Sequence, residues 1–233
     1  MTDSNRRRAA LLTALMGESY IVRNGSSAMA LKIVMFSDYI CPFCYVGFET
    51  MRRLKREFDF QLEWRGFQIH PDWPAEGIPI DKARETIDPA SRVALWKRIS
   101  AMAEAVGFSM KAPAVLTNSR AALAATEFAR ESGRDEALEE RIYRAYFNEG
   151  VNIGDADTVA RLAAEAGLDA GEVADAIKSP SYEMRLKNNS LAAHQRGVSG
   201  VPTFFIGEFP LVGAQSLDAT RAILKRATER FAS

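Results

Sequence analysis

The spacing of apolar and polar residues changes along the chain, and it predicts strands at both ends with helices between them. The run 31–36, Leu-Lys-Ile-Val-Met-Phe, is short, apolar and partly β-branched, which is typical of a buried strand. Apolar residues fall near helical spacing over 45–58, and they alternate with polar residues over about 60–67. A strand, a helix and a second strand in such short order predict a right-handed crossover between two parallel strands.

The middle of the chain is predicted to be helical throughout, from about residue 80 to residue 196. The proline-rich stretch 69–79 before it is interpreted as a boundary loop. Asp169, with Glu172 after it, has the form of a capping box and opens one of the helices. The other helices are expected over about 90–107, 118–132, 136–147, 155–167 and 181–196.

Strand patterns return near the carboxyl end. Residues 203–206 and 209–212 are apolar runs joined by Gly207-Glu208, which favours an antiparallel hairpin with a type II′ turn. Ser216 then caps a helix that runs to about residue 231. We therefore expect an α/β fold in which a helical insertion, 80–196, interrupts a discontinuous sheet domain made of 29–79 and 197–233.

Residues 1–28 differ from the rest and are interpreted as an N-terminal extension, either disordered or not native. Arg6, Arg7 and Arg8 precede a short apolar run, as at the front of a signal peptide, but Glu18 soon interrupts it. We expect a cytoplasmic protein; a cleaved signal would instead make it periplasmic or secreted. No apolar stretch approaches the ~20 residues of a membrane span, so no membrane partner is expected.

The composition argues against several classes of function. The chain of 233 residues has 30 basic and 30 acidic side chains, and this zero net charge gives no reason to expect a nucleic-acid partner. Two cysteines are too few for a disulfide-dense scaffold or a four-cysteine zinc site. No metal site is expected, and no glycine-rich phosphate loop indicates a nucleotide.

The two cysteines, Cys41 and Cys44, carry the candidate chemistry. Cys41 follows a predicted strand and opens a predicted helix, so unpaired backbone N–H groups and the helix dipole should favour its thiolate. Pro42 suits an early helical position. Cys44 lies one turn further and can close a disulfide, which makes Cys41 the attacking thiol and Cys44 the resolving one. The alternatives are inert buried cysteines, half of a zinc site with the distant His70 or His194, and a structural disulfide.

Two motifs carry a family resemblance. Cys-Pro-Phe-Cys at 41–44 after a strand, and Gly-Val-Pro-Thr at 200–203 before a hairpin, resemble the DsbA-type thioredoxin superfamily. The FrnE-like branch is similar also at 64–67, 118–120, 145–147 and 213–215, and the resemblance runs from about residue 30 to the C-terminus. It implies a thioredoxin fold with a large α-helical insertion between the βαβ and ββα halves. It also implies a cis bond at Val201–Pro202 beside the cysteines, with the Val201 backbone binding an extended substrate.

We therefore expect a thiol–disulfide oxidoreductase in which Cys41 and Cys44 are catalytic and Pro42, Phe43, Val201 and Pro202 bind substrate. The expected substrates are protein or peptide thiols and disulfides. No cofactor is required, and glutathione or a thioredoxin-type reductant would be the redox partner. Because periplasmic DsbA enzymes carry histidine where this chain has Phe43, we expect a more reducing potential.

Two other functions stay open. One is a glutathione-dependent isomerase or kappa-type transferase of the same architecture, although those relatives generally present serine at the position of Cys41. The other is a binding protein whose thiols are incidental.

Overall fold

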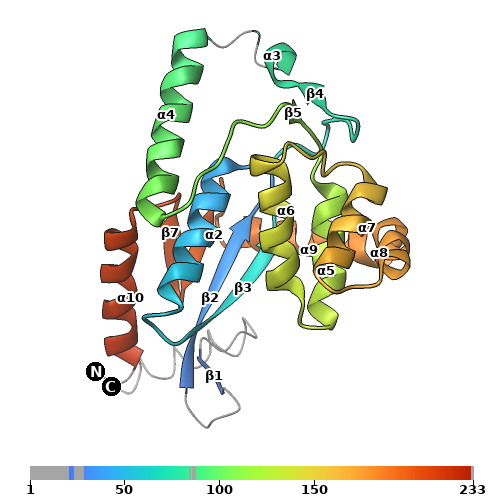
Figure 1. Ribbon diagram of the computed structural model, residues 1–233. Coiled ribbons are helices and arrows are strands. Elements are labelled where there is room, and N and C mark those ends of the chain that lie inside the picture. The colour runs from blue at the N-terminus through green and yellow to red at the C-terminus, as the bar shows by residue number, and fades with distance from the viewer. Residues whose placement is uncertain (1–20, 24–28, 84, 86–87, 232–233) are drawn as a thin grey trace.

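The computed structural model describes residues 21–23, 29–83, 85 and 88–231, and its centre is a mixed sheet (Figure 1). Strand β2 (Met29–Ser37) is the central strand, because three others pair with it. β3 (Phe60–Gly66) runs parallel to it, whereas β1 (Ile21–Arg23) and β6 (Thr203–Ile206) run antiparallel. β7 (Phe209–Val212) pairs with β6 as the predicted antiparallel hairpin, and Gly207 in its turn has a φ of 62°.

The predicted βαβ crossover is confirmed, but its helix is displaced from the predicted 45–58. Helix α2 spans Pro42–Leu54, with the extended backbone of Cys41 as its N-cap and Pro42 in its first turn. The apolar periodicity marks only the buried face of a helix, whereas its first residue is set by the local backbone at Cys41. Residues 55–58 form turns that return the chain to β3.

The insertion contains most of the predicted helices at nearly the predicted bounds. Asp88, Asp155 and Asp169 cap three of them, each carboxylate accepting a hydrogen bond from a backbone N–H three residues later. The helices are α3 (Ile80–Ala83), α4 (Pro89–Val106), α5 (Arg120–Glu131), α6 (Asp135–Asn148), α7 (Ala156–Glu165), α8 (Ala170–Lys178) and α9 (Pro180–Gln195).

The prediction that residues 80–196 are helical throughout is wrong at one place. β5 (Val115–Leu116) pairs antiparallel with β4 (Ile78–Pro79), so a small second sheet fastens the boundary loop to the insertion. A bridge of two residues is too short to show a period in the sequence, and its partner lies far away along the chain.

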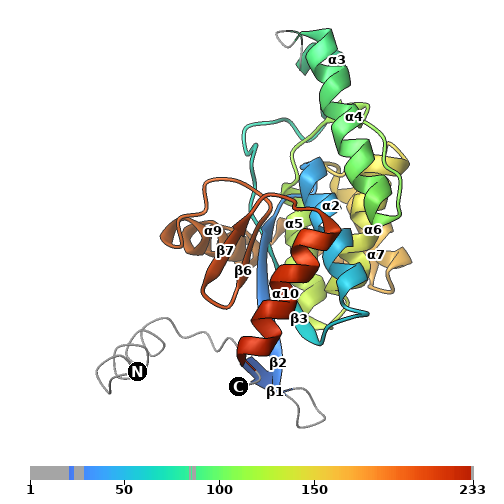
Figure 2. The same cartoon turned by 90° about the vertical axis from the view of Figure 1, so that its left-hand side faces the viewer.

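Alternate residues of β2 point into two different hydrophobic cores. Ile33 and Met35 belong to the large core under α2, which continues through α5, α6 and α7. Val34 and Phe36 belong to a small core on the opposite face, closed by Ala193 near the end of α9. The terminal helix α10 (Leu217–Phe231), whose N–H at Ala219 bonds the predicted Ser216 cap, lies beside α2 (Figure 2). The sheet and the insertion therefore share the large core.

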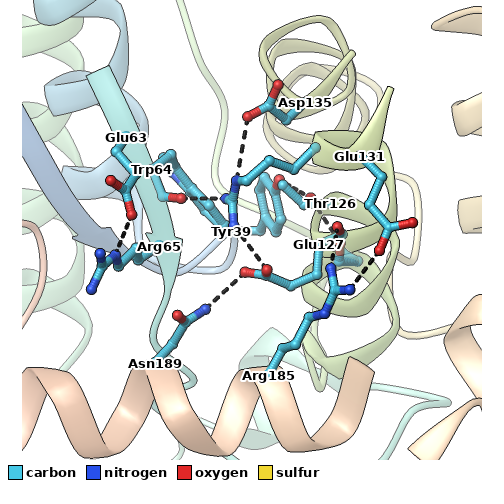
Figure 3. Close-up of polar contacts among 12 residues, drawn as sticks. Tyr39, Glu63, Trp64, Arg65, Thr126, Glu127, Glu131, Asp135, Arg185 and Asn189 are labelled. Atoms are coloured by element: carbon cyan, nitrogen blue, oxygen red, sulfur yellow. Dashed lines mark hydrogen bonds and ion pairs between the residues drawn. The ribbon is translucent and has the colours of Figure 1, made fainter. Parts of the chain in front are cut away.

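A polar network also joins the insertion to the sheet (Figure 3). Arg130 of α5 donates to the backbone carbonyl of Trp64 in β3 and to the buried Glu127, and it is paired with Asp135 of α6. Asn189 of α9 donates to the other oxygen of Glu127 at 2.8 Å. One guanidinium thus connects β3, α5 and α6, and Glu127 extends the network to α9.

Only part of the predicted N-terminal extension falls within the described residues. Residues 21–23 form β1 and pair with residues 29–31 of β2. The residues on which the signal-peptide hypothesis rests lie outside the described part of the chain. Among the helices of the described part, none has the length and apolar character that crossing a membrane requires.

Candidate active site

Cys41 lies where the sheet meets helix α2, at the position that the sequence predicts. Its backbone is extended, with φ −88° and ψ 114°, and its carbonyl accepts the Cys44 N–H at 3.0 Å. Cys41 is 7% exposed and Cys44 is fully buried, and both are free thiols. Cys41 thus occupies the N-cap of α2, where the N–H groups of the first turn have no partner within the helix, and its side chain accepts no hydrogen bond from them.

The loop before β6 brings a second segment to the same sulfur. The Val201–Pro202 peptide bond is cis, the isomer that the family resemblance implies. The Cys41 thiol donates to the carbonyl oxygen of Val201 with an Sγ to O distance of 3.6 Å. The N–H of Gly213 bonds the Pro202 carbonyl at 2.8 Å and so holds this loop to the end of β7.

Gly47 permits this close approach, and the sequence reasoning missed it. A Cβ atom at Gly47 would lie 2.9 Å from Cζ of Phe204 and 3.4 Å from Cγ of Pro202. Helix α2 can therefore pack on the proline loop only without a side chain at this position. A glycine inside a helical pattern, where it is unfavourable by roughly 1 kcal/mol, was the available signal.

The other predicted binding residues surround Cys41. Pro42 and Phe43 are half-buried in the first turn of α2, and Val201 is half-buried beside them. Next to the proline loop, an apolar groove of about 430 Å³ runs between α2, α4 and the start of α10. Its lining includes Val46, Met102, Val106, Ala214 and Leu217.

Cys44 sits in surroundings that favour its neutral thiol. Burial raises the pKa of Cys44 well above its ordinary value, and the neighbouring Cys41 raises it further. Two hydrogen-bond donors oppose this shift, the hydroxyl of Ser37 and the backbone N–H of Asp38. Cys44 is therefore protonated at neutral pH and must lose its proton before it can attack.

Asp38 is a buried acid in the turn between β2 and Cys41, and the sequence reasoning did not single it out. Its carboxylate accepts the N–H of Ile69 at 2.8 Å and the N–H of Ile40 at 3.3 Å. Burial raises the pKa of Asp38 to about 6, against the lowering effect of these hydrogen bonds. The side chain thus ties the loop after β3 to the turn that carries Cys41.

The two histidines have partners other than the cysteines. His70 stacks on Trp73 with ring centroids 3.7 Å apart, and partial burial lowers its pKa. His194, near the end of α9, is hydrogen-bonded through Nδ1 to the carbonyl of Ser190. The described residues contain no cluster of three or more histidine, cysteine or acidic side chains that could hold a metal ion.

Curated relatives align with most of the chain. A protein of Bacillus subtilis, the uncharacterized protein YwbO, is 30% identical over 193 residues, which cover 82% of this chain and 94% of that protein. The 2-hydroxychromene-2-carboxylate isomerase of Sphingobium xenophagum is 26% identical over 196 residues, covering 84% of this chain and 99% of the isomerase.

Solved structures share the architecture. A probable DsbA oxidoreductase from Streptomyces coelicolor superposes with a TM-score of 0.76 at 26% identity, over 85% of this chain and 90% of that one. The cytosolic disulfide reductase DsbM from Pseudomonas aeruginosa has the same fold, with a TM-score of 0.63 at 19% identity, over 85% of this chain and 99% of its own.

Most of the sequence also matches the pattern of one protein family. The matched stretch, residues 32–225, runs from β2 into α10 and contains Cys41, Cys44 and the cis-proline loop. Motifs, thioredoxin-like topology and relatives therefore agree, and the chain belongs to the DsbA-like thioredoxin domain family.

Proposed function

We propose that this protein is a thiol–disulfide oxidoreductase that exchanges with protein or peptide thiols through Cys41 and Cys44. The observation that carries the proposal is the position of Cys41, at the N-cap of α2 and 3.6 Å from the carbonyl of Val201. A nucleophilic sulfur there lies beside the Val201 backbone, which an extended peptide can bind by strand-like hydrogen bonds.

The reaction consists of two exchange steps. The Cys41 thiolate attacks one sulfur of a substrate disulfide, and the other substrate sulfur leaves with the electron pair and takes up a proton. Cys44 then loses its proton and attacks Cys41, and the second substrate sulfur leaves as a thiol. The substrate gains two electrons and two protons, and the enzyme pair becomes a disulfide. Run backwards, the same steps oxidise a substrate dithiol.

Substrate binding is assigned to Pro42, Phe43, Val201 and Pro202, which surround Cys41. The apolar groove beside the proline loop suits the apolar side chains of an unfolded or extended polypeptide. Neither a metal nor an organic cofactor takes part in the exchange steps.

Glutathione or a thioredoxin-type reductant would return the pair to the dithiol. The likeness to DsbM, whose structure with glutathione has a TM-score of 0.64 at 18% identity, supports glutathione as partner and the cytoplasm as the compartment.

Insulin reduction by the wild type, Cys41→Ser and Cys44→Ser tests the proposal. We expect loss of activity in Cys41→Ser and a trapped mixed disulfide in Cys44→Ser. Because the chain has two cysteines, the double variant is a thiol-free control. Full activity of Cys41→Ser would contradict the proposal and favour a binding protein with incidental thiols.

The alternative is a glutathione-dependent isomerase or kappa-type transferase, favoured by the alignment with 99% of the Sphingobium isomerase. Such an enzyme needs no resolving thiol. Isomerase or glutathione-conjugation activity that survives in Cys44→Ser, without insulin reduction by the wild type, would select this alternative.

A further inference from the structure

Two buried hydroxyl groups lie next to the resolving thiol. Ser37 is the last residue of β2, and strand alternation turns its side chain toward the face that α2 covers, where Ile33 and Met35 also point. Its Oγ lies 2.7 Å from the phenol oxygen of Tyr143, which comes from α6 in the insertion. Ser37 and Tyr143 are both fully buried.

The Ser37 hydroxyl is also a hydrogen-bond partner of Cys44: burial raises the pKa of this thiol, and the hydrogen bond from Ser37 opposes the rise. Burial raises the pKa of Tyr143, and the charge of a Cys44 thiolate raises it further. A hydroxyl is one donor and an acceptor, so Ser37 can accept from Tyr143 while it donates to Cys44. Hydrogen bonds that run in one direction along such a chain strengthen one another in a buried site.

The aromatic core holds the phenol in place. The ring of Tyr143 stacks on Tyr45 with centroids 4.9 Å apart and planes within 3°, and the Tyr39 ring packs edge-on at 4.9 Å. The titratable groups beside Cys44 are Cys41 on its own helix and Tyr143 on α6, whereas Asp38, in the turn after β2, meets it through a backbone N–H. Both are negative when ionised, so only neutral hydrogen-bond donors are left to stabilise a Cys44 thiolate.

We propose that the hydroxyl of Ser37, oriented by Tyr143, stabilises the Cys44 thiolate and so drives resolution of the mixed disulfide. The inference deepens the proposed function and rests on it. In this step Cys44 loses its proton, its sulfur bonds Cys41, the bond from Cys41 to the substrate breaks, and the departing sulfur takes up a proton. Ser37 touches the reacting sulfur, whereas Tyr143 is a positioning residue that acts through Ser37.

Titration of Cys44 in a Cys41→Ser background tests the stabilisation directly. Cysteine labelled with ¹³C at Cβ then gives one signal, because no other cysteine is present, and its chemical shift follows ionisation. We expect Ser37→Ala and Tyr143→Phe to lower the thiolate fraction at a given alkaline pH about three- to ten-fold, the effect of one hydrogen bond. Ser37→Thr keeps the hydroxyl and should restore the titration.

The kinetic counterpart uses 5,5′-dithiobis(2-nitrobenzoate) on the reduced protein with both cysteines. Attack by Cys41 releases one thionitrobenzoate, and resolution by Cys44 releases the second. Ser37→Ala and Tyr143→Phe should slow only the second release, by about the same factor. Tyr146→Phe is the matched control: it removes another buried hydroxyl of α6, bonded to the Val115 carbonyl at 3.0 Å, away from the cysteines.

Unchanged titration and unchanged second release in Ser37→Ala and Tyr143→Phe would overturn the inference while leaving the proposed function intact. An equal effect of Tyr146→Phe would also overturn it, because the cause would then be a loosened core. Conversely, a shifted titration in a protein without insulin reduction would support the stabilisation of Cys44 and contradict the proposed function.

Discussion

The thiol of Cys41 donates to the carbonyl oxygen of Val201, 160 residues further along the chain, with an Sγ to O distance of 3.6 Å. This contact brings together the first helix of the βαβ half and the loop that opens the ββα half. A substrate that pairs with the Val201 backbone is thereby placed over the sulfur that must attack it. The helical insertion between the two halves contributes side chains to the core that buries Cys44, among them Tyr143 of α6.

Phe43→His should make the cysteine pair more oxidising. Histidine next to Cys41 would add a donor or a positive charge that stabilises the thiolate, and so stabilises the reduced form. We expect a potential less negative by roughly 30 mV or more, since 30 mV is about 1.4 kcal/mol for this couple. Equilibration with glutathione buffers measures it. Phe43→Leu is the control, and a potential unmoved by histidine would contradict the role assigned to position 43.

Asp38 should make folding stability depend on pH below neutrality. Its pKa of about 6 in the folded protein lies above the ordinary 3.8, so the folded state keeps a proton that the unfolded chain has already lost. The free energy of unfolding therefore falls as pH rises from about 4 to about 6, by up to ~1.4 kcal/mol per pH unit.

Asp38→Asn should remove this dependence, because an amide does not titrate. Urea unfolding at several pH values should show the variant most destabilised relative to wild type at the acidic end. Asp155→Asn is the control, since hydrogen bonds from Thr158 lower the pKa of Asp155 and give a dependence of opposite sign. A wild-type profile parallel to that of Asp38→Asn would disprove the assignment.

Gly47→Ala should push helix α2 away from the cis-proline loop. The new methyl would meet Phe204 at 2.9 Å, and overpacking of this kind destabilises by typically 1–3 kcal/mol, offset by about 1 kcal/mol of helix propensity. We expect a modest loss of stability with a larger loss in kcat/KM for insulin reduction. Gly200→Ala, where a Cβ meets nothing within 4 Å, controls for the stability measurement. Equal kcat/KM in Gly47→Ala and wild type would refute this packing constraint.

Arg130→Met should destabilise the protein by roughly 2–4 kcal/mol, because it leaves the carboxylate of Glu127 buried without its main cation. Arg185→Met is the matched change, since the pair of Arg185 with Glu131 is about half exposed and such pairs contribute ~0–1 kcal/mol. Denaturant unfolding of both variants gives the comparison. Similar losses would mean that the network around Arg130 does not fasten the insertion to the sheet.

Local patterns in the sequence were enough for most elements and for the cysteine pair. Helix caps and tight turns depend on residues within about four positions of each other, so the neighbouring sequence is enough to predict them. Examples are the caps at Asp155, Asp169 and Ser216 and the turn at Gly207. The assignment to the FrnE-like branch and the domain boundaries stay predictions.

The sequence by itself determined that Cys41 lies at a strand-to-helix junction with Cys44 one turn behind it. Only the tertiary structure decided what surrounds them: the Val201 carbonyl, the space left by Gly47, the buried carboxylate of Asp38 and the contact of Ser37 with Tyr143. The physical reason is that backbone hydrogen bonds and caps form between near neighbours in the chain. Packing of the core, by contrast, brings together segments more than a hundred residues apart, such as Ser37 and Tyr143, and no local pattern encodes which atoms then meet.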